Sequence, residues 1–269
     1  MKKVSILAFI VCTLLITACG SNGSEFVGYW VGYWRNSQEE RIFFEITHYK
    51  DNQYFVEPLS KSVRGLKLTA IYKDGMLEME GEMEGEKLVL DKKTGTINDI
   101  YGKGGFTKSS PKEFAAFRRI VDVHFFINGI MFAQWRQNGT AGVSRRYAST
   151  DGSTGRPAAA EILEIARSGF RPDPNVAFAI TVAPDGETYI VIAGHTDKGS
   201  PVYVGGTLEG ILNGVPYDAN FRPPANIKLP ATLHTYTCSD DHCSKVTQGP
   251  ARTYTGPTGV GHDGAAKMK

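Results

Sequence analysis

Short apolar stretches separated by turn residues dominate the chain from Phe26 to about Lys108. Each stretch has the length of a β-strand, and no helical pattern interrupts the series. Such spacing is typical of an antiparallel meander that closes into a small barrel or sandwich. We therefore predict an all-β domain here, with turns at Lys50-Asp51-Asn52, Lys73-Asp74-Gly75 and Lys93-Thr94-Gly95.

One hairpin inside this domain follows from the positions of its apolar residues. Leu77, Met79 and Met83 occupy odd positions, whereas Leu88 and Leu90 occupy even ones. A strand repeats its apolar side chains every two residues, so the phase changes between Met83 and Leu88. We expect the turn at Glu84-Gly85-Glu86.

The sequence GYWVGYW at 28–34 repeats Gly-Tyr-Trp within seven residues. Two glycines and four aromatic residues make a poor helix, so we expect a strand. One face of this strand would carry Gly28, Trp30, Gly32 and Trp34. The other face would carry Tyr29, Val31 and Tyr33. We predict that the repeat supplies core residues of the barrel. The alternative is an aromatic binding platform made by Tyr29, Trp30, Tyr33 and Trp34.

The chain changes character after Ser109-Ser110-Pro111. Residues 112–137 have the apolar spacing of a helix, and 157–169 predict a second helix. Two strands joined by a turn at Asp185-Gly186 follow, and then a third strand at Pro201. The last sixty or so residues predict loops with one strand near 231–237. The overall fold class is α+β, with an all-β barrel followed by a smaller module of two helices on an antiparallel sheet.

Outside the first twenty residues the cysteines are Cys238 and Cys243. An exported chain enters an oxidising compartment, so a small-loop disulfide is the main expectation. The flanking His234 and His242 permit a zinc site as the alternative.

The amino terminus has the pattern of an export signal. Lys2 and Lys3 precede an apolar run over 4–16, which is too short for a transmembrane helix of about 20 residues. The sequence Ile16-Thr17-Ala18-Cys19 resembles the lipobox of bacterial lipoproteins. The resemblance implies cleavage before Cys19, its lipidation and attachment to a membrane. Gly20 and Ser21 follow without an Asp, which in that family favours the outer membrane.

Two further resemblances concern the folded modules. Gly28-Tyr29-Trp30 and the later rhythm of strands up to Phe106 are similar to small lipocalin-like domains of bacterial lipoproteins, which implies a barrel with a Trp at one end. The helix ending in Gly169-Phe170, with the strands that follow, resembles the globular head of type IV pilins and pseudopilins. The predicted organisation is a signal peptide at 1–18, a lipidated tether at 19–25, a lipocalin-like barrel at 26–108, a pilin-head-like domain at 109–256 and a flexible tail at 257–269.

Motifs for common enzyme chemistry are absent from the sequence: there is no Gly-x-Ser-x-Gly, no phosphate-binding loop and no His-Glu-x-x-His. His195 with Asp197 and Ser200 follows a predicted strand, but a solvated turn explains these residues as well. His124 lies among apolar residues and is expected to be packed in the core. We therefore predict no enzyme activity, no cofactor and no metal site.

The formal net charge of +2 gives no indication of a nucleic-acid partner. The expected partners are the membrane, through Cys19, and a protein of the cell envelope. The predicted function is a non-catalytic binding or assembly lipoprotein, with an accessory role in a pilus or secretion system as one form of it. The alternative is an inhibitor or immunity lipoprotein that neutralises a toxin or hydrolase in the envelope.

Overall fold

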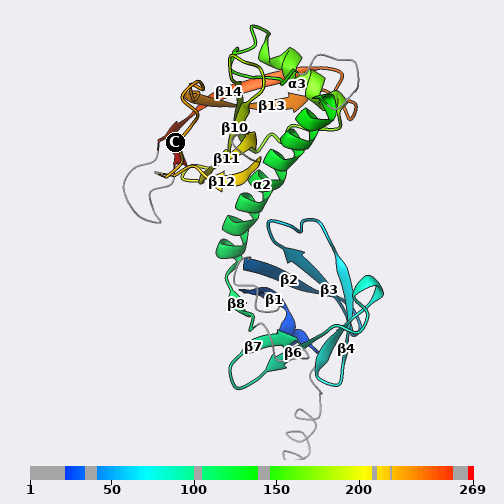
Figure 1. Ribbon diagram of the computed structural model, residues 1–269. Coiled ribbons are helices and arrows are strands. Elements are labelled where there is room, and N and C mark those ends of the chain that lie inside the picture. Colours follow the sequence, from blue (N-terminus) through cyan, green and yellow to red (C-terminus); the bar gives the residue numbers. More distant parts are fainter. Residues whose placement is uncertain are drawn as a thin grey trace, which may run out of the picture. The chain divides into compact units, whose positions relative to one another are not determined.

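The computed structural model describes residues 22–33, 41–99, 105–138, 146–207, 211–218, 220–256 and 266–269. The chain forms two compact units, one up to Phe117 and the other from Arg118 onward. Figure 1 shows the strands of unit 1 in blue to green and those of unit 2 in yellow to red. The division falls inside helix α2 (Pro111–Asn138), nine residues beyond the predicted boundary at 108.

Unit 1 is built from antiparallel strands (Figure 1), with tight turns at the three predicted positions, around Asp51, Asp74 and Thr94. A short 3₁₀ turn, η1 (Ser24–Phe26), precedes the first strand, and η2 (Gly81–Met83) connects the fifth to the sixth. The strands are β1 (Gly28–Tyr33), β2 (Arg41–Lys50), β3 (Gln53–Leu59), β4 (Leu68–Lys73), β5 (Met76–Met79), β6 (Lys87–Asp91), β7 (Thr96–Asp99) and β8 (Thr107–Ser109).

The eight strands form a nearly closed barrel. The sheet has the order β7-β6-β5-β4-β3-β2-β1-β8, and a bridge between Ile97 and Phe106 connects its two ends. The predicted change of phase is confirmed, because Leu77 of β5 pairs directly with Leu88 of β6. The expected strand position of Met83 is wrong, since β5 ends at Met79 and Met83 lies in η2, which forms the first half of the connection, followed by Glu84-Gly85.

The barrel core contains Trp30, as predicted from the Gly-Tyr-Trp repeat. The largest side chains that it buries completely are Phe26, Trp30, Tyr54, Ile46, Leu77, Ile97 and Phe106. Gly32 has a specific role in this packing, because a Cβ atom there would lie 2.6 Å from the ring of Phe106. The second glycine of the repeat therefore makes room for the strand that closes the barrel.

Helix α2 begins with a reciprocal cap. The amide of Ser110 donates to Glu113 Oε2 at 3.0 Å, and the amide of Glu113 donates to Ser110 Oγ at 3.2 Å. Hydrogen bonds from Ser110 and Ser109 hold the pKa of the Glu113 carboxyl below its usual value. The first turns of the helix pack on the outside of the barrel, where Phe117 stacks on Phe43 at 4.6 Å.

Unit 2 combines the rest of α2 and α3 (Ala158–Arg167) with a sheet of seven strands. The predicted hairpin is confirmed, because β9 and β10 pair antiparallel along their full length. The strand order is β12-β11-β10-β9-β13-β14-β15. The bounds are β9 (Val176–Val182), β10 (Tyr189–His195), β11 (Val202–Thr207), β12 (Ile211–Pro216), β13 (Thr232–Cys238), β14 (Val246–Thr255) and β15 (Lys267–Met268).

Both faces of this sheet are buried. The face with Phe178 and Val191 packs on the helices, through residues such as Ile127 of α2 and Ile165 of α3. The opposite face packs on Ile227 and on other residues of the connection from β12 to β13. Central strands that are covered on both sides explain the continuous apolar runs in β9 and β10.

The last third of unit 2 contains more strand than the sequence analysis predicted. The expectation of loops is wrong for β12 and β14, and the expected tail over 257–269 is wrong for its last four residues. β15 pairs with the end of β14, and Met268 is 2% exposed. Gly249-Pro250 weakened the strand pattern of β14; the structure accommodates it with a bulge opposite Thr235.

Candidate functional site

An apolar cavity of about 250 Å³ lies at one end of the barrel. This is the end at which β2 and β4 begin and β3 finishes. Its walls are mostly aliphatic, aromatic and thioether side chains, among them Phe44, Val56, Leu68, Met79, Met83 and Leu88. Leu66, which also lines the cavity, is 41% exposed, so the cavity meets solvent beside this residue.

The opposite end of the barrel is closed by the residues that precede β1. Phe26 is fully buried, and its carbonyl accepts a hydrogen bond from Trp30 Nε1 at 2.7 Å. The ring of Tyr72 packs edge-on against Phe26, with centroids 6.2 Å apart. The Tyr54 hydroxyl donates to the carbonyl of Asn22, which ties the incoming chain to this end. The barrel is therefore plugged at one end and has an apolar cavity at the other.

The connection from β3 to β4, residues 60–67, forms one side of the cavity mouth. Its sequence SKSVRGLK contains three basic residues and no acidic residue. Lys67 pairs with Glu57 at 3.1 Å and lies 4.0 Å from the centroid of the Phe55 ring. Gly65, with a φ of 73°, makes the tight turn that precedes the exposed Leu66. We call residues 60–67 the mouth loop.

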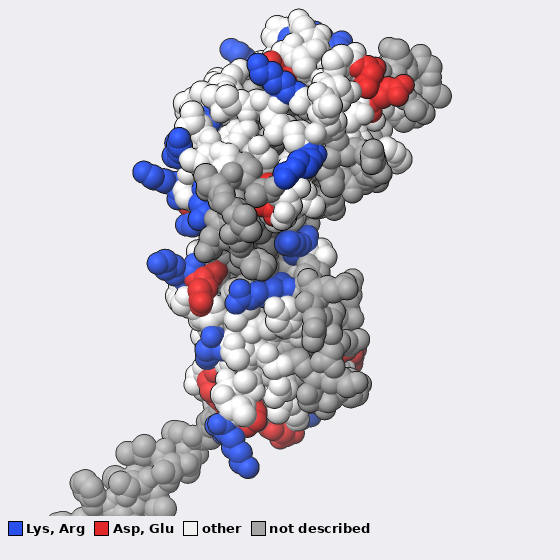
Figure 2. Space-filling model, turned by 60° about the vertical axis from the view of Figure 1, so that its left-hand side comes forward, with Lys and Arg blue, Asp and Glu red and all other residues white. Residues whose placement is uncertain are grey.

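Two of the residues that line the cavity have ionisable side chains, Glu86 and Lys87. Lys87 Nζ lies 2.6 Å from Glu78 Oε1 on the neighbouring strand. The hydrogen bond from Lys87 lowers the pKa of the Glu78 carboxyl. On the face of the molecule shown in Figure 2, positive and negative side chains lie interspersed among uncharged ones.

The aromatic residues proposed as a binding platform do not share one exposed surface in the structure. Trp30 is 1% exposed and belongs to the core. Tyr29 packs on Phe114 of α2, with ring centroids 4.6 Å apart. Tyr33 is 46% exposed. Trp34 lies outside the described residues, as does the predicted lipidation site Cys19.

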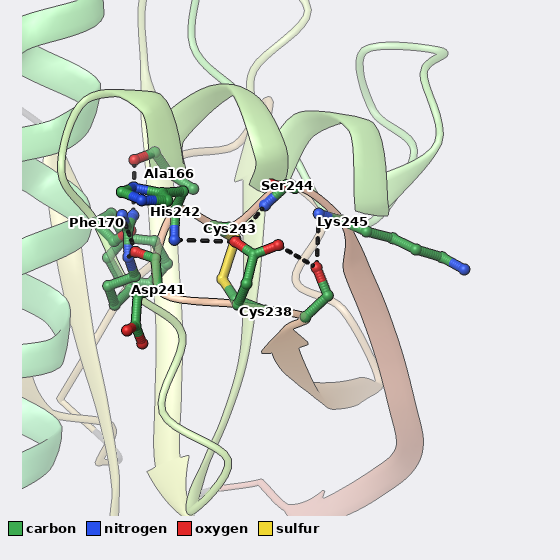
Figure 3. Close-up of a disulfide and its surroundings, with 11 residues drawn as sticks. Ala166, Phe170, Cys238, Asp241, His242, Cys243, Ser244 and Lys245 are labelled. Atoms are coloured by element: carbon green, nitrogen blue, oxygen red, sulfur yellow. Dashed lines mark hydrogen bonds between the residues drawn. A yellow bond between two sulfur atoms is a disulfide. The ribbon is translucent and has the colours of Figure 1, made fainter.

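The predicted disulfide is present in unit 2. Cys238 and Cys243 are bonded and join the end of β13 to the loop that leads into β14 (Figure 3). The Arg171 guanidinium donates to the carbonyl of Asp241 at 2.9 Å and to that of Ala166 at 3.0 Å. The disulfide loop is therefore connected to the end of helix α3.

The zinc alternative for this loop is not supported by the positions of its side chains. Asp240 Oδ1 accepts hydrogen bonds from the amides of His242 and Ser244, at 2.9 and 3.1 Å. The bond from Ser244 is the main reason that the pKa of Asp240 is lowered. Across the described residues, no group of three or more His, Cys, Asp or Glu side chains is arranged to hold a metal ion.

His195 and Asp197 form a turn and lack the geometry of a catalytic pair. His195 Nδ1 accepts a hydrogen bond from the amide of Asp197 at 3.3 Å. The Asp197 carboxylate pairs with Arg119 at 2.8 Å, and the same oxygen lies 3.7 Å from His195 Nδ1. His124 is buried, with its ring centroid 4.7 Å from that of Tyr203. The prediction of a packed His124 is confirmed.

Unit 2 has a larger and more polar cleft of about 800 Å³. It lies where β13 diverges from β9, since these strands share only the register pair His234 and Phe178 among the described pairings. Asp151, in its wall, accepts hydrogen bonds from the Thr181 hydroxyl at 2.6 Å and from the amide of Ser153 at 3.0 Å. This carboxylate thus holds the wall of the cleft in place.

Comparisons with protein-family models, curated proteins and solved structures found no match for this chain. In the part of the chain that the structure describes, no helix is both long and apolar enough to cross a membrane.

Sequence analysis missed the cavity and its mouth. The apolar pattern placed Met79 on one face of a strand. It could not predict the cavity, because the cavity forms only where five strands come together. The mouth loop did carry a signal, because it places Val63 and Leu66 among three basic residues between two strands. Apolar residues in an acid-free loop could have marked this end of the barrel as a candidate surface.

Proposed function

We propose that this protein is a lipid-anchored envelope protein that acts by binding, without catalysis, and that the barrel cavity receives an apolar group of its ligand or partner. The observation that carries this proposal is that the barrel is closed at one end and has an apolar cavity at the other. Phe26 and Tyr72 close one end, while the apolar cavity at the other meets solvent beside Leu66. This arrangement is that of a small lipocalin-like binding domain.

The size and lining of the cavity define what it can accept. Its volume of about 250 Å³ lies below the range of roughly 300–1,000 Å³ that is usual for sites enclosing a drug-sized ligand. One large side chain, or the end of an alkyl chain, matches this space. Complete burial of such a group contributes about 1.5–3 kcal/mol. The two methionines in the wall suit a site that adapts its shape to the group that enters.

The proposed attachment rests on the amino-terminal sequence. The lipobox-like residues place the acylated Cys19 three positions before Asn22, the first residue that contacts the barrel in the described chain. Gly20 and Ser21 favour the outer membrane. Replacing Cys19 by Ser should release the protein from the membrane fraction; retention of this variant in membranes would contradict the anchor.

The cavity itself is tested with a neutral fluorescent apolar probe, N-phenyl-1-naphthylamine. Titration of the full chain should give saturable fluorescence enhancement. Leu68→Trp and, separately, Met83→Trp fill the cavity and should abolish the enhancement. Phe132→Ala, which alters an exposed ring of unit 2, is the matched control and should change nothing. Equal enhancement by wild type and both filled variants would contradict the site.

The pilus or secretion role and the inhibitor role are two forms of this binding function. A cavity that accepts one apolar side chain of a partner protein is compatible with either role. An assembly role requires assembly genes beside this gene and altered piliation or secretion after its deletion. An inhibitor role requires a neighbouring secreted toxin or hydrolase and harm to the cell when this gene alone is deleted.

A further inference from the structure

The cleft of unit 2 has no part in the proposed function, yet it has the size of a ligand site. Its volume of about 800 Å³ lies within the range of roughly 300–1,000 Å³ that is usual for such sites. Two segments form its main walls. One is the loop 150–153, which lies along the edge of β9, and the other is the start of β13 with the preceding residues 226–231.

The backbone of β9 is already paired on its side of the cleft. The amide of Ile180 donates to Thr150 Oγ1 at 2.8 Å, and the amide of Val182 donates to Ser153 Oγ at 3.0 Å. The carbonyl of Ile180 accepts a hydrogen bond from the amide of Thr150 at 2.9 Å. This wall therefore has side chains to offer a ligand, but little free backbone.

The wall made by β13 differs because the edge of this strand is open. Thr232 and Leu233 pair with β14 on one side. On the other side, the described pairing of β13 with β9 consists of His234 and Phe178 alone. Successive residues of a strand direct their N–H and C=O groups to alternate sides, so part of the edge before His234 points into the cleft. Extended peptides bind proteins by hydrogen bonding to such strand edges.

The two walls carry side chains of opposite charge. Asp151 lies in the wall beside β9, and Lys228 lies in the wall that leads into β13. The Asp151 oxygens accept hydrogen bonds from the Thr181 hydroxyl and the Ser153 amide, and a carboxylate can accept further ones. Lys228 is exposed, and within the described residues its ammonium has no ion pair and no hydrogen bond.

The other ionisable groups at the cleft do not change this balance. His234 lines the cleft, and its Nδ1 lies 3.0 Å from Gln248 Nε2. Asp185 lies outside the lining, and its carboxylate accepts a hydrogen bond from Asn226 Nδ2 at 3.3 Å. The lining residues that the structure describes include no Phe, Tyr or Trp ring on which a sugar or a base could stack. The cleft therefore suits a ligand with one charge of each sign.

We infer that this cleft binds a short zwitterionic peptide, which lies extended along the open edge of β13. Its free ammonium group is placed at Asp151 and its free carboxylate at Lys228. The backbone of the peptide forms hydrogen bonds with the edge of β13. This site is separate from the barrel cavity and goes beyond the proposed function.

Peptide binding is measured by calorimetric titration of the full chain with tetra-alanine that has both termini free. Binding should be saturable. Acetylation of the amino terminus or amidation of the carboxyl terminus should each weaken it at least tenfold, because each removes one charge. Methylation of both inner amide nitrogens should also weaken it at least tenfold, because it blocks pairing with β13. No binding of tetra-alanine, or equal binding of the modified peptides, would overturn the inference.

Two variants assign the ends of the peptide. In Asp151→Asn, the affinity for the free peptide should fall to that of wild type for the acetylated peptide. In Lys228→Gln, it should fall to that of wild type for the amidated peptide. Asp241→Asn and Lys245→Gln, at exposed positions of the disulfide loop, are the matched controls and should bind like wild type. No loss in a cleft variant, or a larger loss than the blocked peptide shows, would overturn the assignment of that end.

NMR of ring-labelled histidine locates the peptide. Tetra-alanine should shift the His234 signals and leave those of His48 in the barrel and His242 in the disulfide loop unchanged. A disaccharide of N-acetylglucosamine should leave His234 unmoved. If the disaccharide shifts His234 and the peptide does not, the cleft serves a saccharide and the inference falls.

The barrel variant Leu68→Trp separates this inference from the proposed function. Peptide binding should persist in this variant, although the naphthylamine probe should no longer bind. If Leu68→Trp abolishes peptide binding, the peptide occupies the barrel cavity; the proposed binding function then stands and the inference falls. If wild type binds the peptide at His234 but never binds the probe, the barrel proposal falls and the inference stands.

Discussion

At the scale of single residues, Trp30 shows why the Gly-Tyr-Trp repeat matters to the fold. Its ring is 1% exposed, its Nε1 donates to Phe26, and the Lys108 ammonium lies 4.1 Å from the centroid of its ring. Burial beside this ring lowers the pKa of Lys108. One residue thus connects β1 to the plug and to β8.

Trp30→Ala should destabilise unit 1 by about 3–5 kcal/mol, because it leaves a large cavity in the core. Trp30→Phe keeps an aromatic ring but loses the hydrogen bond to Phe26, and should cost less than Trp30→Ala. Urea denaturation measures both. Tyr33→Ala, at an exposed position of the same strand, should change stability by no more than about 0.5 kcal/mol. A larger effect at Tyr33 than at Trp30 would contradict this assignment of the core.

Asp240 makes the stability of unit 2 depend on pH at the acidic end. Its pKa is lowered in the folded state, chiefly by the amide of Ser244. A group with a lowered folded pKa stabilises the fold fully above its unfolded pKa of about 3.9, and this stabilisation is lost as the pH falls through the folded value.

Asp240→Asn should therefore be less stable than wild type at pH 7, and the difference should shrink below pH 4. Unfolding midpoints measured between pH 7 and pH 2 test this. A difference that stays constant across the range would show that the charge of Asp240 is not responsible.

At the scale of elements, helix α2 depends on its first turn. The Ser110–Glu113 cap satisfies amide groups that would otherwise lack partners at the helix start. Ser110→Ala should cost about 1 kcal/mol, while Lys112→Ala, an exposed neighbour, should be nearly neutral. Thermal or urea unfolding compares them; equal effects would show that the cap contributes nothing specific.

The disulfide stabilises the turn between β13 and β14. Closure of so short a loop contributes roughly 2 kcal/mol by the chain-entropy estimate. Cys238→Ser/Cys243→Ser should lose about this amount, and a thiol reductant should bring wild type to the same stability. If reduction leaves the unfolding midpoint unchanged, the bond does not support unit 2.

The elements also show what sequence can and cannot predict. Local patterns identified the meander, both helices, the β9–β10 hairpin and the cysteine pair, because each depends on neighbouring residues. β14 was missed because its support is not local: β13 and α3 hold a segment whose Gly249 and Pro250 weaken it as a strand. The cavity was missed because it depends on how five strands come together.

At the scale of the whole molecule, the barrel of unit 1 is closed at one end by the residues before β1 and has an apolar cavity at the other. The aromatic residues of the repeat contribute mainly to structure, as Trp30 and Tyr29 show. The proposed binding role belongs to the opposite end of the barrel, where the apolar walls of the cavity meet the mouth loop. The proposal that the protein acts by binding therefore depends on contacts at this mouth.

The most direct test places a photoreactive amino acid at position 66 of the full-length protein in the cells that produce it. The account predicts a discrete crosslinked product from position 66 that disappears when Leu68→Trp fills the cavity, and no such product from position 92 at the closed end. No product from 66, the same products from both positions, or a product that persists in the filled variant would contradict binding at the mouth.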